Sequence, residues 1–298
     1  MQAHRKLLPD GRRWHFQHGP IDLVIGADGD ATAIAAAHEA AWQRFEGVLA
    51  ELVGELPLLR RRVMGPCPLQ GTIARRMWWA CRPFHSEFIT PMAAVAGAVA
   101  QEIIAFYERP GIARAWVNNG GDIALHLAQG ESVKVGVVAD ASDPLVATDA
   151  SFAVTSTMPV RGIATSGWRG RSFSLGIADS VTILAKTAAQ ADAAATIVAN
   201  AVDVDDPRIA RCPASTLKDD TDLGDIPVTV AVPPLPDEQL RIALERGRRR
   251  ALELQHAGLI HSALLACQQR YARIEPIPAG DIGVDPDIAR RQVGSVFA

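Results

Sequence analysis

The chain has 298 residues but only four cysteines, and they form no Cys-x-x-Cys pair. They are spread along the sequence as Cys67, Cys81, Cys212 and Cys267. This spacing argues against both a disulfide framework and a structural zinc site. We therefore expect a reducing, cytoplasmic compartment.

The sequence also lacks a long apolar run. The alanine-rich stretch 91–105 contains Gln101 and Glu102, and it is too short and too mixed to span a bilayer. The basic residues 4–6 are followed by Pro9, with no apolar segment of the kind found in a secretory signal. We expect no membrane partner.

A strong charge of one sign is absent as well. The 30 basic and 33 acidic residues leave a formal net charge of −3, so no global field attracts nucleic acid or an anionic membrane. Arginines do cluster at 60–62, 75–76 and 246–250. The last cluster shares a predicted helix with Glu245 and Glu253, which favours a solvated helical face. We expect no nucleic-acid partner, and an RNA-binding surface is our third hypothesis.

The hydrophobic content of 48% is enough for a substantial core. Apolar periodicity predicts helices at 32–55, 91–107 and 237–256, and one that begins after Thr187. Strands are predicted at 14–17, 21–26, 113–117, 123–127, 133–138, 152–155, 160–164, 180–185 and 227–232. Neighbouring strands with separated helices indicate an α/β (α+β) fold, with a mixed, mainly antiparallel sheet flanked by helices. One domain is expected over 1–275, followed by a tail at 276–298 that lies over the surface or is mobile.

Asp192 and Thr196 are the residues most suggestive of chemistry. They stand four residues apart in an alanine-rich helix whose start has a capping box, Thr187 and Gln190. Both side chains therefore lie on one helix face, where a carboxylate and a hydroxyl suit Mg²⁺. In the alternative interpretation Asp192 is a favourable charge near a helix N-terminus, and Thr196 fills the core or bonds back to its own helix.

Glycines between polar residues mark two further candidate loops. In the first, Asn119, Gly120, Gly121 and Asp122 follow a predicted strand, so the backbone can approach a ligand while Asn and Asp give specific hydrogen bonds. The plainer alternative is a simple hairpin turn, for which Asn, Gly and Asp are the usual residues.

The second candidate loop combines hydroxyls, arginines and a tryptophan. Thr165, Ser166 and Gly167 precede Trp168, Arg169 and Arg171. Backbone N–H groups and guanidinium groups can hold phosphates, and the indole can stack on a planar ring. The alternative is an exposed basic loop.

Four segments, taken in order, resemble the ApbE family of FAD:protein FMN transferases. They are Val117–Ile123 (VNNGGDI), Ala164–Gly167 (ATSG), Ser180–Leu184 (SVTIL) and Ala191–Thr196 (ADAAAT). The corresponding family segments read approximately N-x-GGDI, ATSG, VTV and AD-x-x-AT. The resemblance covers about 91–202, and it implies an ApbE-like domain over 1–275 that encloses FAD bound through Mg²⁺.

The resemblance also assigns roles to individual residues. It implies that Asp192 and Thr196 are side-chain metal ligands, that a backbone carbonyl near 94–95 is a further ligand, and that 120–122 and 165–167 are flavin-site loops. The chain departs from the family in having Ala96 and Gln101 where a lysine and an aspartate are usual, and its shortened segment 168–179 has no histidine. These departures indicate a divergent cytoplasmic branch.

We therefore expect a small phosphate-bearing ligand, FAD or a related flavin or pterin, with Mg²⁺. If the chain is an enzyme, the resemblance implies FMN transfer or pyrophosphate cleavage, with Asp179 as a base or second acidic ligand and Arg169 or Arg171 neutralising phosphate charge. The alternative is a non-catalytic cofactor carrier or assembly partner. Whether the protein forms a homo-oligomer is open.

Overall fold

A nine-stranded sheet forms the centre of the computed structural model, which describes residues 2–137, 150–276 and 294–297. The strand order is β1-β2-β3-β4-β5-β8-β9-β12-β13, and all neighbours are antiparallel. The bounds are β1 (His4–Leu7), β2 (Trp14–His18), β3 (Ile21–Gly29), β4 (Ile112–Asn119), β5 (Asp122–Leu127), β8 (Gly162–Ser166), β9 (Ser180–Ala185), β12 (Ser262–Cys267) and β13 (Arg270–Ile274).

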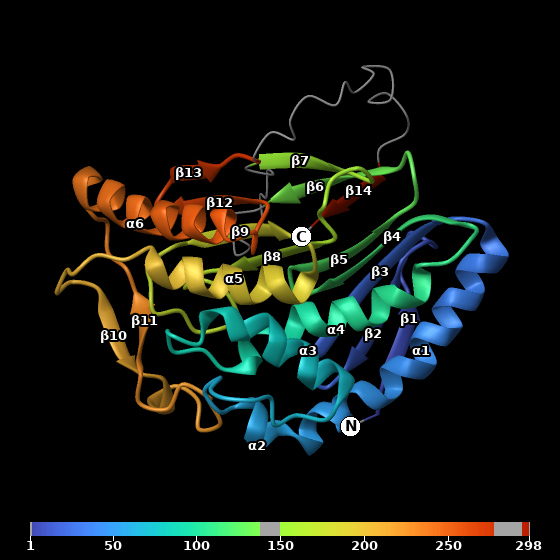
Figure 1. Ribbon diagram of the computed structural model, residues 1–298, viewed down its shortest axis with the longest axis horizontal. Coiled ribbons are helices and arrows are strands. Elements are labelled where there is room, and N and C mark those ends of the chain that lie inside the picture. The colour runs from blue at the N-terminus through green and yellow to red at the C-terminus, as the bar shows by residue number, and fades with distance from the viewer. Residues whose placement is uncertain (1, 138–149, 277–293, 298) are drawn as a thin grey trace.

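Helices cover one face of this sheet (Figure 1). They are α1 (Ala31–Gly54), α2 (Leu56–Leu59), α3 (Thr72–Cys81), α4 (Val95–Ile104), α5 (Ala188–Ala201) and α6 (Asp237–His256), with short 3₁₀ turns η1 (Arg82–Phe84), η2 (Pro91–Ala94), η3 (Ala105–Tyr107) and η4 (Ala214–Thr216). The main core lies between these helices and the sheet. None of the helices in the described part of the chain is long and apolar enough to cross a membrane.

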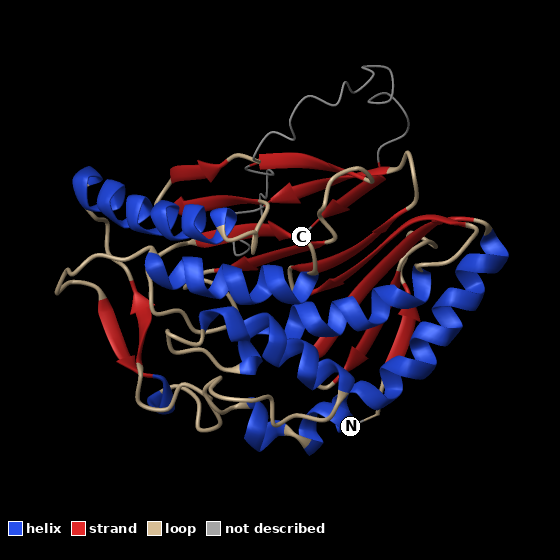
Figure 2. Cartoon of the chain, viewed as in Figure 1, coloured by secondary structure: helices blue, strands red, loops and turns tan. Residues whose placement is uncertain are grey.

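A small second sheet packs on the opposite face, so the protein has three layers (Figure 2). It contains β6 (Ser132–Val137), β7 (Ala150–Thr155) and β14 (Gly294–Phe297). Val133, Val135 and Val154 of this sheet share a core cluster with Trp116, Ile123 and Leu125 of the large sheet. A separate pair, β10 (Ala210–Pro213) and β11 (Pro227–Ala231), completes the strands. Because β14 is parallel to β6, the expected mixed, mainly antiparallel architecture is confirmed.

The alternation of side chains along β4 and β5 decides which residues face the helices. Ala115, Val117 and Ala124 belong to the core under the helices, whereas Trp116 and Ile123 belong to the core under the small sheet. Side chains alternate with a period of two along a strand. Asn119 and Asp122, which continue this alternation, therefore lie on the helical side.

Several elements were not predicted from the sequence, among them helix α3 and the β12–β13 hairpin. Helix α3 has an apolar face of Ile73, Met77 and Trp78, but its paired arginines made it read as a basic cluster. The β12–β13 hairpin has no turn signal, because its two turn residues are Gln268 and Gln269, which take positive φ angles of 45° and 63° without being glycine.

Other boundaries moved by small amounts. The helix expected at 32–55 is α1, which begins after Asp30, whose carboxylate accepts a hydrogen bond from Ala33 N at 2.8 Å. The helix expected at 91–107 is divided into η2, α4 and η3. Residue 138 of a predicted strand, and 277–293 and 298 of the predicted tail, lie outside the described residues. The last described segment of the tail is β14, which pairs with β6 in the small sheet.

A buried imidazole joins α1 to η3. The Nδ1 atom of His38 lies 2.6 Å from the Tyr107 hydroxyl, and the ring packs against Trp14 at a centroid distance of 5.8 Å. Burial, and then the charge of Arg5, lowers the pKa of His38 from 6.5 to about 4. The folded protein therefore prefers the neutral imidazole.

This preference makes acid stability a test of the fold. Because the unfolded chain takes up the proton first, the stability contributed by neutral His38 is complete above about pH 6.5 and is lost as the pH falls towards 4. The difference between these two pKa values corresponds to about 3 kcal/mol in the free energy of unfolding. We expect the free energy of unfolding, measured in urea, to fall between pH 7 and pH 4 in the wild type. In His38→Phe the fall should be smaller by about 3 kcal/mol.

Tyr107→Phe is the matched control, because it removes the hydroxyl partner but keeps the buried imidazole. It should lower stability at every pH and retain the steep dependence. Parallel curves for the wild type and His38→Phe would contradict the assignment.

Candidate ligand and metal site

The predicted site residues meet at one end of the large sheet. The pairs Asn119 with Asp122, Ser166 with Val181, and Ser180 with Ala266 all lie at this end, because each strand reverses the direction of its neighbour. The β4–β5 turn, the segment after β8 and the start of β9 are therefore brought side by side. Helices α4 and α5 lie over the same region (Figure 1).

Asp192 joins α5 to the N-terminus of α4. Its Oδ2 accepts a hydrogen bond from Gly97 N at 2.9 Å. Ala94, the residue that precedes α4, provides no side-chain cap, so a carboxylate from another helix satisfies the exposed N–H group. The helices approach closely because a Cβ on Gly97 would lie 2.3 Å from the carbonyl oxygen of Ala188. Asp192 thus caps the N-terminus of α4, whereas the alternative interpretation concerned a charge near the start of its own helix.

The β4–β5 turn places two buried polar side chains beside this contact. Asn119 and Asp122 are each only 8% exposed. Asn119 Nδ2 donates to Ala96 O at 3.1 Å, and Asp122 Oδ1 accepts from Thr165 N at 3.2 Å. The turn therefore ties β8 and the first turn of α4 together.

The two carboxyl groups oppose each other electrostatically. Burial raises the pKa of Asp192 to about 7, although the N–H groups of Gly97 and Ala96 act in the opposite direction. Burial, and then the charge of Asp192, raises the pKa of Asp122 well above its ordinary value. Two buried carboxylates that resist simultaneous ionisation are stabilised by a cation placed near both.

The donor set of this region consists of oxygen atoms. Thr196 lies one helical turn after Asp192, and both side chains are half-buried. Mg²⁺ prefers carboxylate and hydroxyl oxygens and keeps several waters, so few protein ligands suffice. Among the described residues no group of three or more His, Cys, Asp or Glu side chains could hold a metal. The carboxylate of Asp192 and the hydroxyl of Thr196 are oxygen ligands of the type that Mg²⁺ takes together with water.

The glycines of the β4–β5 turn have a clear conformational role. Gly120 and Gly121 have φ angles of +65° and +110°, and Gly121 N donates to Asn118 Oδ1 at 2.8 Å. The segment therefore forms a hairpin turn between β4 and β5, as in the alternative interpretation of the sequence. It also lies beside a cation, because a Cβ on Gly120 would be 3.6 Å from Arg171 Nη1.

The hydroxyls of Thr165 and Ser166, in the predicted flavin-site loop 165–167, lie on opposite faces of the sheet. Thr165 bonds Thr182 at 3.0 Å, and both follow the alternation of the face away from the helices. Only the Thr165 backbone N–H reaches Asp122. Ser166, one position further, lies on the helical side. Gly167 is required by close packing, because a Cβ there would lie 2.3 Å from Asp179 O.

Asp179 is surrounded by donors. Its Oδ1 accepts from Trp168 Nε1 at 3.3 Å and from Arg169 Nε at 3.0 Å, and its Oδ2 accepts from Gln268 N. Sequence reasoning considered Asp179 as a base or acidic ligand and did not identify Gln268. The turn containing Gln268 had no recognisable signal, so this contact was not predictable.

The arginine clusters are largely engaged by protein groups. Arg248 pairs with Glu245 at 2.7 Å, and Arg250 pairs with Glu253 at 2.9 Å. Arg76 pairs with Glu102 at 2.8 Å. These pairs favour the structural interpretation of the clusters over an RNA-binding surface.

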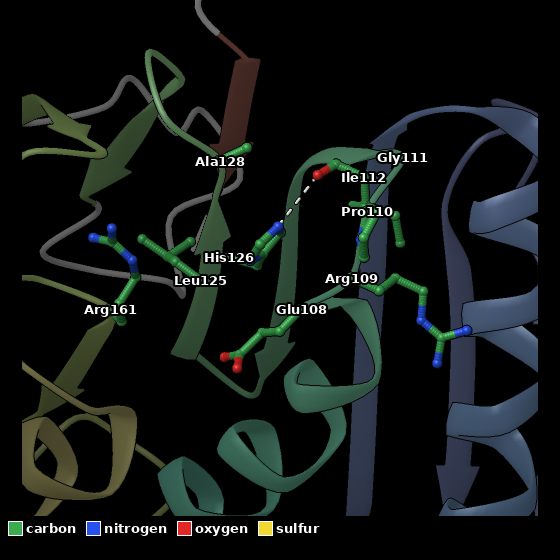
Figure 3. Close-up of a pocket in the computed structure, with 9 residues that line it drawn as sticks. All are labelled: Glu108, Arg109, Pro110, Gly111, Ile112, Leu125, His126, Ala128 and Arg161. Atoms are coloured by element: carbon green, nitrogen blue, oxygen red, sulfur yellow. Dashed lines mark hydrogen bonds between the residues drawn. The ribbon is translucent and has the colours of Figure 1, made fainter.

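A surface hollow of about 550 Å³ lies at the opposite end of β4 and β5 (Figure 3). His126 Nε2 lies 3.2 Å from Ile112 O there, and Glu108 lies at its edge. Arg161 also lines the hollow, but its guanidinium donates to the carbonyl oxygens of Ser156, Met158 and Val160. None of the residues predicted for the site lines this hollow.

A family model described as AbpE bacteria matches residues 5–283. The chain belongs to this family. The match extends beyond the region 91–202 that carried the motif resemblance, and it confirms the relationship predicted from the four segments.

Curated relatives of this AbpE bacteria family member are UPF0280 proteins. The one from Methanopyrus kandleri is 34% identical over 201 residues, which is 67% of this chain and 78% of the relative. The one from Methanothrix thermoacetophila is 38% identical over 134 residues, 45% of this chain and 53% of the relative. The one from Methanospirillum hungatei is 40% identical over 119 residues, which is 40% of this chain and 47% of the relative. The chain spans about half the length of the last two.

Two solved structures align with most of the chain at low identity. An ApbE protein from Thermotoga maritima is 13% identical with a TM-score of 0.48, covering 92% of this chain and 96% of that one. The apo form of the flavinyl transferase ApbE from Pseudomonas stutzeri is 12% identical with a TM-score of 0.41, covering 92% and 94%.

The close approach of α4 and α5 gives a test of the site's framework. Gly97→Ala places a methyl group against Ala188 O and the Asp192 side chain, so it should lower the free energy of unfolding by about 2 kcal/mol or more. Gly47→Ala is the matched control, because Gly47 lies in α1 with no atom within 4 Å of the added Cβ. That change should raise stability by up to about 1 kcal/mol. Equal effects of the two changes in urea unfolding would refute the packing argument.

Proposed function

We propose that this protein binds FAD, or a related phosphate-bearing flavin or pterin, together with Mg²⁺ held by Asp192 and Thr196. The observation that carries the proposal is the half-buried Asp192 carboxylate, which lies beside the buried Asp122 and the first turn of α4. Membership of the AbpE bacteria family and the order of the four ApbE-like segments support the flavin class.

Mg²⁺ would act here between protein carboxylates and ligand phosphates. When bound, the ion neutralises phosphate oxygens and polarises the phosphoryl group. Asp192 and Thr196 would hold it, and Asp122 would add negative charge close by. Arg171, exposed beside Gly120, would meet phosphate charge from the side of the β4–β5 turn. Asn119 would keep the Ala96 peptide, and with it the start of α4, in place.

The proposed reaction, if the protein is an enzyme, is Mg²⁺-dependent transfer of a flavin nucleotide or cleavage of a pyrophosphate. One observation favours the second candidate, a cofactor carrier or assembly protein without chemistry. Gln101, which stands where the ApbE pattern has an aspartate, accepts a hydrogen bond from Ala189 N at 3.4 Å and so serves helix packing.

The compartment we propose is the cytoplasm. All four cysteines are free thiols in the structure. This arrangement suits a reducing environment, in which disulfides rarely persist.

Asp192→Asn tests the metal proposal without removing the cap on α4. The amide oxygen can still accept from Gly97 N, but the charge that holds the cation is gone. FAD affinity in the presence of Mg²⁺, measured by isothermal titration calorimetry, should fall on the order of 100-fold, or about 3 kcal/mol. Thr196→Val should weaken it by a smaller factor.

Asp219→Asn is the matched control, because it removes one negative charge from an exposed loop. It should leave the affinity unchanged. EDTA should reduce wild-type binding to the level of Asp192→Asn. If FAD binds the wild type and Asp192→Asn equally well in Mg²⁺, the metal assignment is wrong.

Turnover distinguishes the enzyme from the carrier. The wild type is incubated with FAD, Mg²⁺ and a protein acceptor that can be flavinylated, and AMP is measured by chromatography. AMP release that disappears in Asp192→Asn indicates the enzyme. Saturable FAD binding without AMP supports the carrier.

A further inference from the structure

Trp168 and Arg169 form a stacked pair that the metal proposal does not use. The Arg169 guanidinium lies 5.2 Å from the centroid of the Trp168 ring. The indole is half-buried, whereas the Arg169 side chain is 42% exposed. A planar cation layered on an aromatic ring is a favourable surface for a second planar ring.

Asp179 fixes both members of this pair through one atom. Its Oδ1 accepts from Trp168 Nε1 and from Arg169 Nε, and its side chain is only 12% exposed. The backbone adds a second anchor, because Trp168 N donates to Ala178 O at 3.0 Å. The ring and the guanidinium therefore have little freedom to leave their relative orientation.

The β12–β13 turn holds Asp179 from the other side. Gln268 N donates to Asp179 Oδ2, while the Gln268 side chain accepts from Leu235 N at 3.0 Å and donates to Pro233 O at 2.7 Å. Gln268 and Gln269 both have positive φ angles, which non-glycine residues adopt at a cost in free energy. These three hydrogen bonds of Gln268 thus stabilise the strained turn, and one of them is donated by its backbone N–H to Asp179.

This assembly lies at the same end of the sheet as Asp122. From β5 the strands β8, β9 and β12 follow in order, so the Asp179 end of β9 is about 10 Å from β5 at a spacing of about 4.8 Å per strand. The intervening loop crosses that gap, since Arg171 of this loop lies beside Gly120. A ligand with a phosphate near Asp192 and a planar ring a few bonds away could reach both places.

We propose that Asp179 is a positioning residue, and that the Trp168–Arg169 pair it holds recognises the ring of the ligand. The ligand class is an electron-poor, planar heteroaromatic ring with carbonyl oxygens, which stacks on the pair and accepts hydrogen bonds from the guanidinium. This inference rests on the proposed function, because it takes the phosphate end of the same ligand to lie at Asp192. Asp179 acts through its neighbours and takes no proton in this role.

The test compares FAD with ADP, which has the adenosine and both phosphates but no isoalloxazine ring. Dissociation constants are measured with Mg²⁺ for the wild type, Asp179→Asn, Trp168→Leu and Trp168→Phe. Asp179→Asn and Trp168→Leu should weaken FAD binding about 10-fold and change ADP binding less than about twofold. Trp168→Phe, which keeps an aromatic face, should recover part of the loss.

Tyr271→Leu is the matched control, because it removes a 51% exposed aromatic ring from the neighbouring strand β13. It should leave both affinities unchanged. Thermal melting of each variant reports its folding separately. A folded Asp179→Asn that weakens FAD and ADP equally, or neither, overturns the positioning role.

The wild type alone separates the two proposals. Binding of FAD and ADP with equal affinity refutes ring recognition and leaves the Mg²⁺ and phosphate proposal standing. Binding of neither ligand refutes the proposed function and this inference together.

Discussion

The contact between the Asp192 carboxylate and the first turn of α4 organises this end of the protein. It satisfies a helix N-terminus that has no cap of its own, and it requires α4 and α5 to approach so closely that only glycine fits at position 97. Asn119 then bonds the same turn of α4 from the sheet. One carboxylate therefore sets the distance between two helices and the turn below them.

The same contact has an electrostatic consequence. The half-buried carboxylate of Asp192 lies near the buried Asp122, and loss of solvation raises the pKa of both groups. Proteins relieve such a conflict by protonation or by a cation. The structural role of Asp192 and the proposed ligand role are thus compatible, since one oxygen can cap α4 while the other faces a metal.

Particular residues show how far sequence reasoning reached. Thr187 and Gln190 predicted the start of α5, because a capping box is a local pattern. Helix α3 was not predicted, because the adjacent charges of Arg75 and Arg76 led to its interpretation as a basic cluster rather than as an amphipathic helix. The β12–β13 hairpin was not predictable, because glutamine at positive φ is held there by tertiary hydrogen bonds rather than by an intrinsic preference.

The sequence by itself determined the family and the fold class, because motif order, periodicity and capping can be recognised along the chain. Only the tertiary structure decided how these residues are used. It separated Thr165, whose hydroxyl faces the small sheet, from Asp122 on the helical side, and it bound Asp179 to Trp168, Arg169 and Gln268. Strand register and helix contact make these choices, and both join residues that lie far apart along the chain.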